Sequence, residues 1–194
     1  ILGIVFARAY YVIFEWSYYK EHLSEIPQIW NGGIAIYGGI IGAFIGAIIG
    51  CKIGKIDFRN LLDLGGLGLL IGQGIGRWGN FFNQEAFGTT TNLPWGMISS
   101  ETTAYLKSYY PLLDSTSPVH PTFLYESLAC ALIFVLLLVI RDKVKNSYAT
   151  IAGYFILYGI TRFFIEGLRT DSLYIGNTSL RTSQVLSAIL VVFG

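Results

Sequence analysis

Charged residues and cysteines are both scarce in this chain of 194 residues. Charged residues make up 13% of it, against roughly 25% in a soluble domain. The two cysteines, Cys51 and Cys130, lie within or beside apolar stretches, which disfavours both a disulfide framework and a catalytic thiol. A formal net charge of +1 gives no support for nucleic-acid binding, which usually requires a strongly basic surface.

Common catalytic and metal-binding patterns are also missing. The only histidines, His22 and His120, have no Cys or Asp set beside them at metal-ligand spacing, so we expect no zinc or iron site. The sequence contains no GxSxG, P-loop or dinucleotide fingerprint in a strand–helix context. The chemistry must therefore come from other residue types.

Apolar residues dominate what remains. They form 53% of the chain, with a mean hydropathy of +0.56, which is typical of a polytopic membrane protein. Because a spanning helix needs about 20 apolar residues, we predict an all-α membrane helical bundle with six spans in a single domain over 1–194. Six apolar stretches support this prediction: 1–14, 32–51, 61–75, 120–140, 149–165 and 180–193. Ile1 is not an initiating Met and no charged n-region precedes it, so we expect the chain to be truncated at its N-terminus.

The charges of the connecting segments orient this bundle. Segment 51–60 carries Lys52, Lys55 and Arg59, and segment 141–147 carries Arg141, Lys143 and Lys145. Short basic connections lie on the cytoplasmic side, so the other three connections, 15–31, 77–119 and 166–181, are expected outside. We predict that 77–119 forms an extracytoplasmic head, with little regular structure over 89–118 because Thr, Ser, Tyr and Pro are frequent there.

Glycines recur at spacings of three to four in the second and third stretches, for example at Gly38, Gly42 and Gly46. Small residues at this spacing let helix backbones approach closely in lipid. The same pattern is also compatible with a lipid-sized groove, and the two interpretations do not exclude each other.

A dense polar cluster follows the apolar stretch 61–75. Arg77, Asn80, Asn83 and Glu85 lie within nine residues, and an arginine offers a planar fork that matches phosphate. Ionisable groups at a membrane edge are costly and are by default candidates for function. We therefore favour an anion site, while a structural Arg77–Glu85 ion pair is the alternative.

A second cluster lies on the fifth stretch. Tyr158, Arg162 and Glu166 follow one another at i,i+4 and share one helical face, and Arg169 follows three residues later. An Arg162–Glu166 pair alone would only make a polar helix tolerable. Because this face and Arg77 are both expected at the outer leaflet, we favour a common site.

The fourth stretch opens with His120-Pro121 and places Glu126 inside the apolar segment. Pro121 suits a first helical turn. A carboxylate at the position of Glu126 must face the bundle and be paired. His120 is a candidate general acid or base, although a single interfacial histidine more often only forms hydrogen bonds.

These clusters match a known family. The stretch 76–88 reads Gly-Arg-Trp-Gly-Asn-Phe-Phe-Asn-Gln-Glu-Ala-Phe-Gly and resembles the signature of bacterial prolipoprotein diacylglyceryl transferases. Three further matches follow the family's order: Trp30-Asn31-Gly32-Gly33 with Tyr37-Gly38-Gly39, His120-Pro121 with Leu124-Tyr125-Glu126, and Tyr158 with Arg162, Glu166 and Arg169. Together they cover almost the whole chain, and the long signature is highly specific.

The resemblance implies a multi-pass transferase of the bacterial plasma membrane whose active site faces outward. Such an enzyme moves the diacylglyceryl group of phosphatidylglycerol to the lipobox cysteine of a preprolipoprotein and releases glycerol 1-phosphate, with no metal or organic cofactor. The family has seven spans, so the first helix and its His-Trp-Tyr-Gly segment would precede this chain. The residues expected to bind phosphatidylglycerol are Arg77, Asn80, Asn83, Glu85, Gly88, Arg162, Glu166 and Arg169.

The expected catalytic residues are Arg77, Arg162, Tyr37, Tyr158 and His120. The leaving phosphate gains charge, which preorganised positive groups stabilise, and Arg77 and Arg162 are the candidates for this role. The attacking cysteine must ionise, and some family members carry a histidine in front of the paired glycines where this chain has Tyr37. Tyr37, Tyr158, Glu85 and His120 therefore stay open as the base.

Two other classes of function remain as alternatives. A lipid or small-solute transporter would also show Gly-interrupted spans with buried charge, but this chain lacks two halves with corresponding broken segments, and its polar residues gather at one membrane edge. A non-catalytic scaffold for envelope assembly would need no converging arginines.

Overall fold

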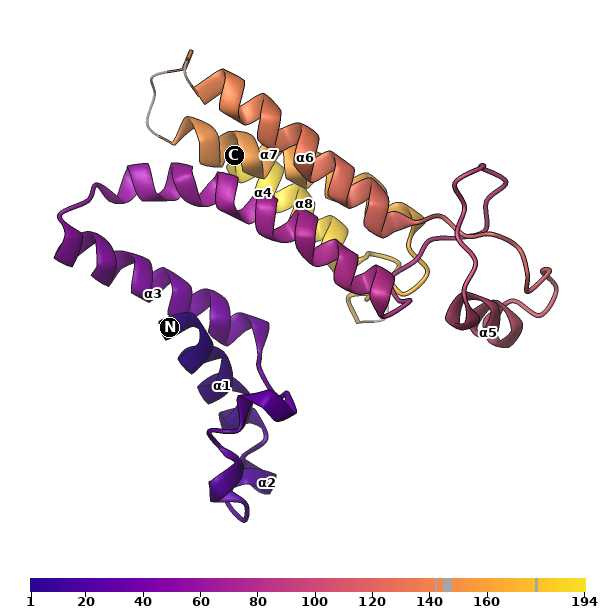
Figure 1. The fold of residues 1–194 in the computed structure, drawn as a ribbon, viewed down its shortest axis with the longest axis horizontal. Coiled ribbons are helices and arrows are strands. Elements are labelled where there is room, and N and C mark those ends of the chain that lie inside the picture. Colours follow the sequence, from indigo (N-terminus) through magenta and orange to yellow (C-terminus); the bar gives the residue numbers. More distant parts are fainter. Residues whose placement is uncertain (142, 145–147, 177) are drawn as a thin grey trace. The chain divides into compact units, whose positions relative to one another are not determined.

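The computed structural model describes residues 1–141, 143–144, 148–176 and 178–194, and the regular secondary structure of this part of the chain is helical, with no extended strands (Figure 1). The all-α prediction is confirmed. Within these residues the α-helices are α1 (Leu2–Phe14), α2 (Trp16–Tyr19), α3 (Ile36–Gly54), α4 (Phe58–Phe82), α5 (Ser100–Tyr109), α6 (Thr122–Arg141), α7 (Ala149–Leu168) and α8 (Thr182–Phe193). The chain divides into two compact units, Ile1–Leu61 and Leu62–Gly194.

Three of the described helices are long and apolar enough to cross a membrane: α3, α6 and α7. They correspond to the second, fourth and fifth predicted spans. The helices α1 and α8 are apolar but have only 13 and 12 residues. Helix α4 has 25 residues and extends the predicted 61–75 segment at both ends, over positions that include Arg59 and Arg77. The count of six spans therefore stays a prediction.

In the first unit, α1 packs against α3 through glycines of α3. A Cβ atom at Gly42 would lie 2.6 Å from the Phe6 Cβ, and one at Gly38 would lie 2.6 Å from the Tyr10 Cβ. Because real Cβ atoms do not approach so closely, these two positions require glycine. The interpretation of close helix packing is therefore confirmed here.

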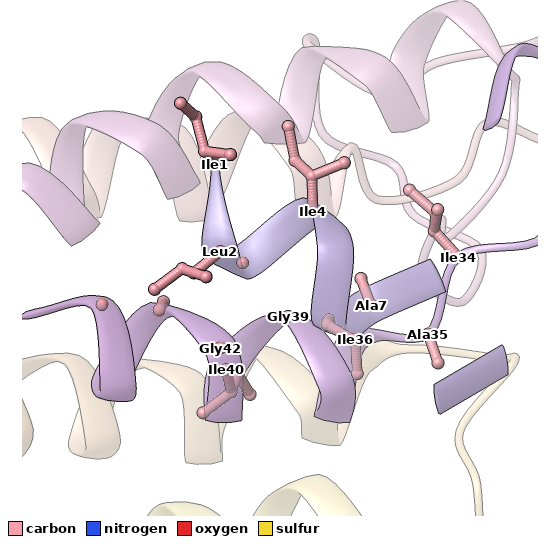
Figure 2. Close-up of a pocket in the computed structure, with 13 residues that line it drawn as sticks. Ile1, Leu2, Ile4, Ala7, Ile34, Ala35, Ile36, Gly39, Ile40 and Gly42 are labelled. Carbon is pink, nitrogen blue, oxygen red and sulfur yellow. The ribbon is translucent and has the colours of Figure 1, made fainter. Parts of the chain in front are cut away.

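An apolar hollow of about 990 Å³ lies along the same pair of helices in the first unit (Figure 2). Leu2 and Ile4 of α1 and Ile36 and Ile40 of α3 are among the residues that line it. Gly39 lines it with backbone alone.

Arg8 of α1 organises the loop that leads into α3. Its Nε and Nη2 donate to the carbonyls of Ile26 and Glu25, both at 2.7 Å, and its Nη1 donates to the carbonyls of Gly32 and Gly33 at 2.9 and 2.7 Å. The side chain is buried, so its charge is stabilised by four carbonyl dipoles instead of a carboxylate. One arginine thus holds two turns of the loop together.

In the second unit, α4, α6 and α7 run side by side (Figure 1) and enclose an apolar core. The buried members of this core are Leu67, Leu70, Cys130, Ile133, Leu137, Ile151, Tyr154 and Tyr158. Helix α8 packs closely on α7, where a Cβ at Gly159 would lie 2.8 Å from a methyl of Val191. The predicted basic connection at 141–147 joins α6 to α7, and its Lys145 lies outside the described residues.

The predicted head segment, 77–119, begins inside α4, which continues to Phe82. The expectation of little regular structure over 89–118 is wrong, because α5 lies within it. A reciprocal capping box starts this helix: Ser99 accepts from the Thr102 N–H, and Thr102 accepts from the Ser99 N–H. A small core of Phe87, Leu106 and Val119 holds α5 against the remainder of the head.

Candidate active site

The carboxylate of Glu126 is the centre of a polar cluster that joins α4, α6 and α7. Its Oε1 lies 2.9 Å from Nη2 of Arg77 and accepts a 2.7 Å hydrogen bond from the Tyr158 hydroxyl. Its Oε2 accepts from Nη1 of Arg162 at 2.9 Å. The Glu126 side chain is only 2% exposed, so both arginines compensate a charge that would otherwise be costly to bury.

The spacing of α7 brings its three polar side chains to this cluster. Tyr158, Arg162 and Glu166 lie on one face, as the i,i+4 pattern predicted, and Nη2 of Arg162 lies 2.6 Å from Oε2 of Glu166. Arg162 therefore bridges Glu126 and Glu166 with two different nitrogens. Glu166 is as deeply buried as Glu126, and its backbone carbonyl also accepts from Arg181, just before α8.

The two asparagines of the 76–88 signature both bind a second carboxylate, that of Glu85. The amide nitrogens of Asn80 and Asn83 each donate to its Oε1 at 3.1 Å. Arg77 connects this group to the first, because its Nη1 donates to Oδ1 of Asn80 at 3.4 Å. The ionic partner of Arg77 is thus Glu126, in place of the Arg77–Glu85 pair that the sequence left open.

The turn after α4 points Glu85 back toward the helix. The backbone N–H of Glu85 donates to the Asn80 carbonyl at 3.0 Å. Gln84 and Ala86 on either side adopt positive φ angles of 54° and 56°, a conformation that costs about 1–2 kcal/mol for a residue other than glycine. Such strain, held by the surrounding hydrogen bonds, is frequent at functional sites.

Arg169 lies just after α7 and forms a bidentate pair with Asp171. Its Nε and Nη2 lie 2.9 and 2.8 Å from the two carboxylate oxygens, and its Nε lies 4.0 Å from Glu166. Burial alone would lower the pKa of Arg169, but the hydrogen bonds and charge of Asp171, together with the charge of Glu166, raise that pKa above its ordinary value. Arg169 therefore stays charged at the edge of the cluster.

Gly88 is a packing position between the head and α7. Its N–H donates to the His120 carbonyl at 2.9 Å, and its backbone pairs with that of Arg169. A Cβ atom here would lie 2.7 Å from the His120 Cβ and 3.1 Å from the Leu168 carbonyl oxygen. Only glycine lets these three segments meet.

His120 belongs to a different network from Glu126. Its Nδ1 lies 3.0 Å from the Tyr125 hydroxyl, which also accepts from the Trp95 indole N–H at 3.0 Å. The ring is therefore linked through Tyr125 of α6 to Trp95 of the head, while its backbone pairs with Gly88 and Thr89. Among the described residues the His120 side chain forms no hydrogen bond with Arg77 or Arg162, so its catalytic role stays a prediction.

Tyr37 lies in the first unit, at the start of α3. Its side chain is 66% exposed, and its ring centre is 6.4 Å from that of Tyr10. Its hydroxyl forms no hydrogen bond among the described residues. Its catalytic role stays a prediction.

Sequence reasoning singled out both arginines but did not include Glu126 among the site residues. The signal was present, because a lone carboxylate inside an apolar helix requires a partner. The sequence could not reveal that both arginines share it. Each guanidinium carries five N–H donors, and the contacts above engage two nitrogens of each. The side chain of Arg77 is 24% exposed and that of Arg162 12%, so Arg77 is the more accessible of the two.

The fold and this cluster define a helical membrane protein with a buried arginine–carboxylate site at one end of its helices. The family described as prolipoprotein diacylglyceryl transferase matches residues 1–194, and the chain belongs to it. The chain is 50% identical over 194 residues to the phosphatidylglycerol–prolipoprotein diacylglyceryl transferase of Finegoldia magna, covering 100% of this chain and 71% of that protein. The enzyme of the same name from Clostridioides difficile is 46% identical, with the same coverage. That of Ligilactobacillus salivarius is 48% identical over 98% of this chain and 70% of its own length.

Proposed function

We propose that this protein transfers the diacylglyceryl group of phosphatidylglycerol to the lipobox cysteine thiol of a preprolipoprotein. The family and the names of its relatives support this reaction. The sulfur forms a thioether bond to the glycerol carbon that bears the phosphate. The carbon–oxygen bond breaks, glycerol 1-phosphate leaves, and the thiol proton passes to a base.

The observation that carries the catalytic proposal is the sharing of Glu126 by Arg77 and Arg162. Negative charge develops on the phosphate oxygen as the carbon–oxygen bond breaks. Two guanidinium groups fixed in advance stabilise that charge without reorganising during the reaction. Glu126 holds both groups at 2.9 Å while their remaining N–H donors face the phosphate.

Glu166 and Tyr158 support this arrangement in the proposal. Glu166 fixes the second nitrogen of Arg162, and Tyr158 donates its hydroxyl proton to Glu126. A phenol that donates to a carboxylate is a poor proton acceptor, so Tyr158 orients Glu126. Tyr37, Glu85 and His120 then remain as candidates for the base.

The asparagines supply neutral donors beside the phosphate. Each of their amide groups has two N–H bonds, and one from each is directed to Glu85. The second N–H of Asn80 and of Asn83 is then available for head-group oxygens. Arg169 adds positive charge at the edge of the site, and Gly88 lets the head backbone lie close to it.

The residues at the ends of the helices support the proposed orientation in the membrane. Arg77 lies in the last turns of α4, Glu126 in the first turns of α6, and Arg162 and Glu166 in the last turns of α7. The basic connections adjoin the opposite ends of these helices. By the positive-inside rule, the cluster and the head face the outside of the bacterial plasma membrane.

Reconstituted vesicles test this function. The full-length protein is incorporated into vesicles with or without phosphatidylglycerol and is given a lipobox peptide that carries either cysteine or serine. Transfer is expected only with phosphatidylglycerol and cysteine together, and is detected as the mass increase of the peptide. Movement of lipid or solute without the peptide, in the absence of transfer, would instead support a transporter.

A further inference from the structure

The N-terminus of α7 is capped by a side chain of another helix. Oδ1 of Asp63 on α4 accepts from the backbone N–H groups of Thr150 and Ile151 at 3.1 and 3.0 Å. Oδ2 accepts from the N–H of Tyr148 at 3.1 Å. The first N–H groups of a helix have no partner within the helix, and the N-cap residue Tyr148 supplies no side-chain acceptor. Asp63 replaces that missing cap.

A carboxylate suits this place for two reasons. It satisfies three N–H groups at once, and its negative charge lies at the positive end of a 20-residue helix dipole. Because the cap comes from α4, the same three hydrogen bonds fix the position of α7 along the axis of α4. A local cap from within α7 would leave that position free.

Further contacts along α4 follow the same line toward the arginines. A Cβ at Gly66 would lie 3.3 Å from the backbone of Ile151, and Gln73 donates to the Tyr154 hydroxyl at 3.0 Å. Asp63 and Arg77 are separated along α4 by about 21 Å, at 1.5 Å per residue. Thr150 and Arg162 are separated along α7 by about 18 Å on the same measure. The cap and the cluster are thus the two ends of one helix–helix contact.

We propose that Asp63 is a positioning residue. It fixes the position of α7 along the axis of α4, so that Arg162 reaches the carboxylate of Glu126 that Arg77 also contacts. A slip of one residue moves a helix by about 1.5 Å, which exceeds what a hydrogen bond tolerates. Asp63 acts without touching the substrate. The inference rests on the proposed function only for its second readout, the rate of transfer.

The first readout is a disulfide that reports the position of α4. A Cβ at Gly74 would lie 3.3 Å from the Cβ of the native Cys130 on α6, close to the roughly 3.5–4.5 Å of a disulfide. Helix α6 is packed tightly on α7, where a Cβ at Gly153 would lie 2.6 Å from a Leu137 methyl. The pair therefore reports α4 against α6 and α7 together.

The experiment uses the full-length protein with Gly74→Cys, with Cys130 retained and every other cysteine replaced, including Cys51→Ala. The rate of disulfide formation under mild oxidation in membranes is measured for this parent, for Asp63→Ala and for Asp63→Asn. Asp57→Ala is the matched control, because among the described residues the Asp57 side chain bonds only to its near neighbour Arg59. We expect at least a tenfold slower disulfide for Asp63→Ala, a smaller decrease for Asp63→Asn, and the parental rate for Asp57→Ala.

Transfer activity supplies the second readout. The kcat of reduced Asp63→Ala is expected to fall about tenfold, and oxidation is expected to return it toward that of the oxidised parent, because the disulfide restores the helix position. A parental disulfide rate in Asp63→Ala would overturn the proposal. If Asp63→Ala does not accumulate, Asp63→Asn decides: a decrease of threefold or more supports the proposal, and the parental rate refutes it. Failure of the proposed function would remove transfer from the parent while leaving the disulfide readout intact.

Discussion

Arg77 and Arg162 contact opposite oxygens of the same carboxylate. Nη2 of Arg77 lies 2.9 Å from Oε1 of Glu126, and Nη1 of Arg162 lies 2.9 Å from Oε2. Two arginines that would otherwise repel each other are thereby held close together in a poorly solvated place. The consequence is a pair of guanidinium groups whose geometry is set before any substrate arrives.

Replacement of Arg77 is expected to abolish transfer. Arg77→Ala should leave a folded membrane protein without measurable turnover at limiting phosphatidylglycerol. Arg77→Lys should recover little, because an ammonium cannot reproduce a planar fork on phosphate. Arg59→Ala is the matched control on the same helix, since Arg59 is exposed and its one ion pair within the described part of the chain is with Asp57. Near-normal turnover of Arg77→Ala would refute the anion site.

Arg162 and Glu166 are expected to differ in their effect on turnover. If Arg162 binds the phosphate and Glu166 only orients it, Glu166→Gln should retain more activity per folded molecule than Arg162→Gln. Removal of one partner of a buried ion pair also costs about 3–5 kcal/mol of stability. The yield of folded protein must therefore be measured beside the rate. Equal losses of rate and yield in both variants would indicate a purely structural pair.

Tyr37→Phe tests the base. Loss of a direct proton acceptor should lower kcat by roughly 10²–10⁴-fold, whereas loss of one neutral hydrogen bond to a head-group oxygen, about 1 kcal/mol, corresponds to a decrease nearer tenfold. We expect the smaller decrease, because a neutral tyrosine hydroxyl is a weak base at neutral pH. The pH–rate profiles of wild type and Tyr37→Phe are compared at saturating lipid. Disappearance of a basic limb in the mutant would make Tyr37 the base.

Gly88→Ala is expected to destabilise the head. The added Cβ would meet His120 at 2.7 Å and the Leu168 carbonyl oxygen at 3.1 Å, and such overpacking typically costs about 1–3 kcal/mol. Gly65→Ala is the control, because no other described segment comes within 4 Å of a Cβ there and alanine favours a helix. Thermal unfolding in detergent should show a lower midpoint for Gly88→Ala only. A midpoint equal to that of wild type would contradict the packing role.

Local patterns predicted the features that depend on neighbours in sequence. The length of the apolar stretches predicted α6 and α7 as helices long enough to cross a membrane. The i,i+4 spacing predicted that Arg162 and Glu166 lie within hydrogen-bonding distance. Arg77 and Asn80 also share a face as expected, because α4 continues past both. In each case the helical period alone brings the side chains together.

Features that depend on distant residues were missed. No pattern within α4 or α6 indicates that Arg77 pairs with Glu126 and not with the nearby Glu85, because the packing of the two helices determines which carboxylate lies within reach. Helix α5 was overlooked because turn-forming residues surround it, although its Ser99–Thr102 cap is a recognisable local signal. The cap that Asp63 gives to α7 joins residues far apart in sequence, and no periodicity reveals it.

The backbone pairing of Gly88 with Arg169 has a mechanical meaning. The N–H of Thr89 donates to the Leu168 carbonyl, and the N–H of Thr170 donates to the Phe87 carbonyl. The head follows α4 in sequence, but these bonds tether it to the C-terminal end of α7. A tilt of α7 would therefore carry residues 87–89 with it, so that the head and this helix move as one body.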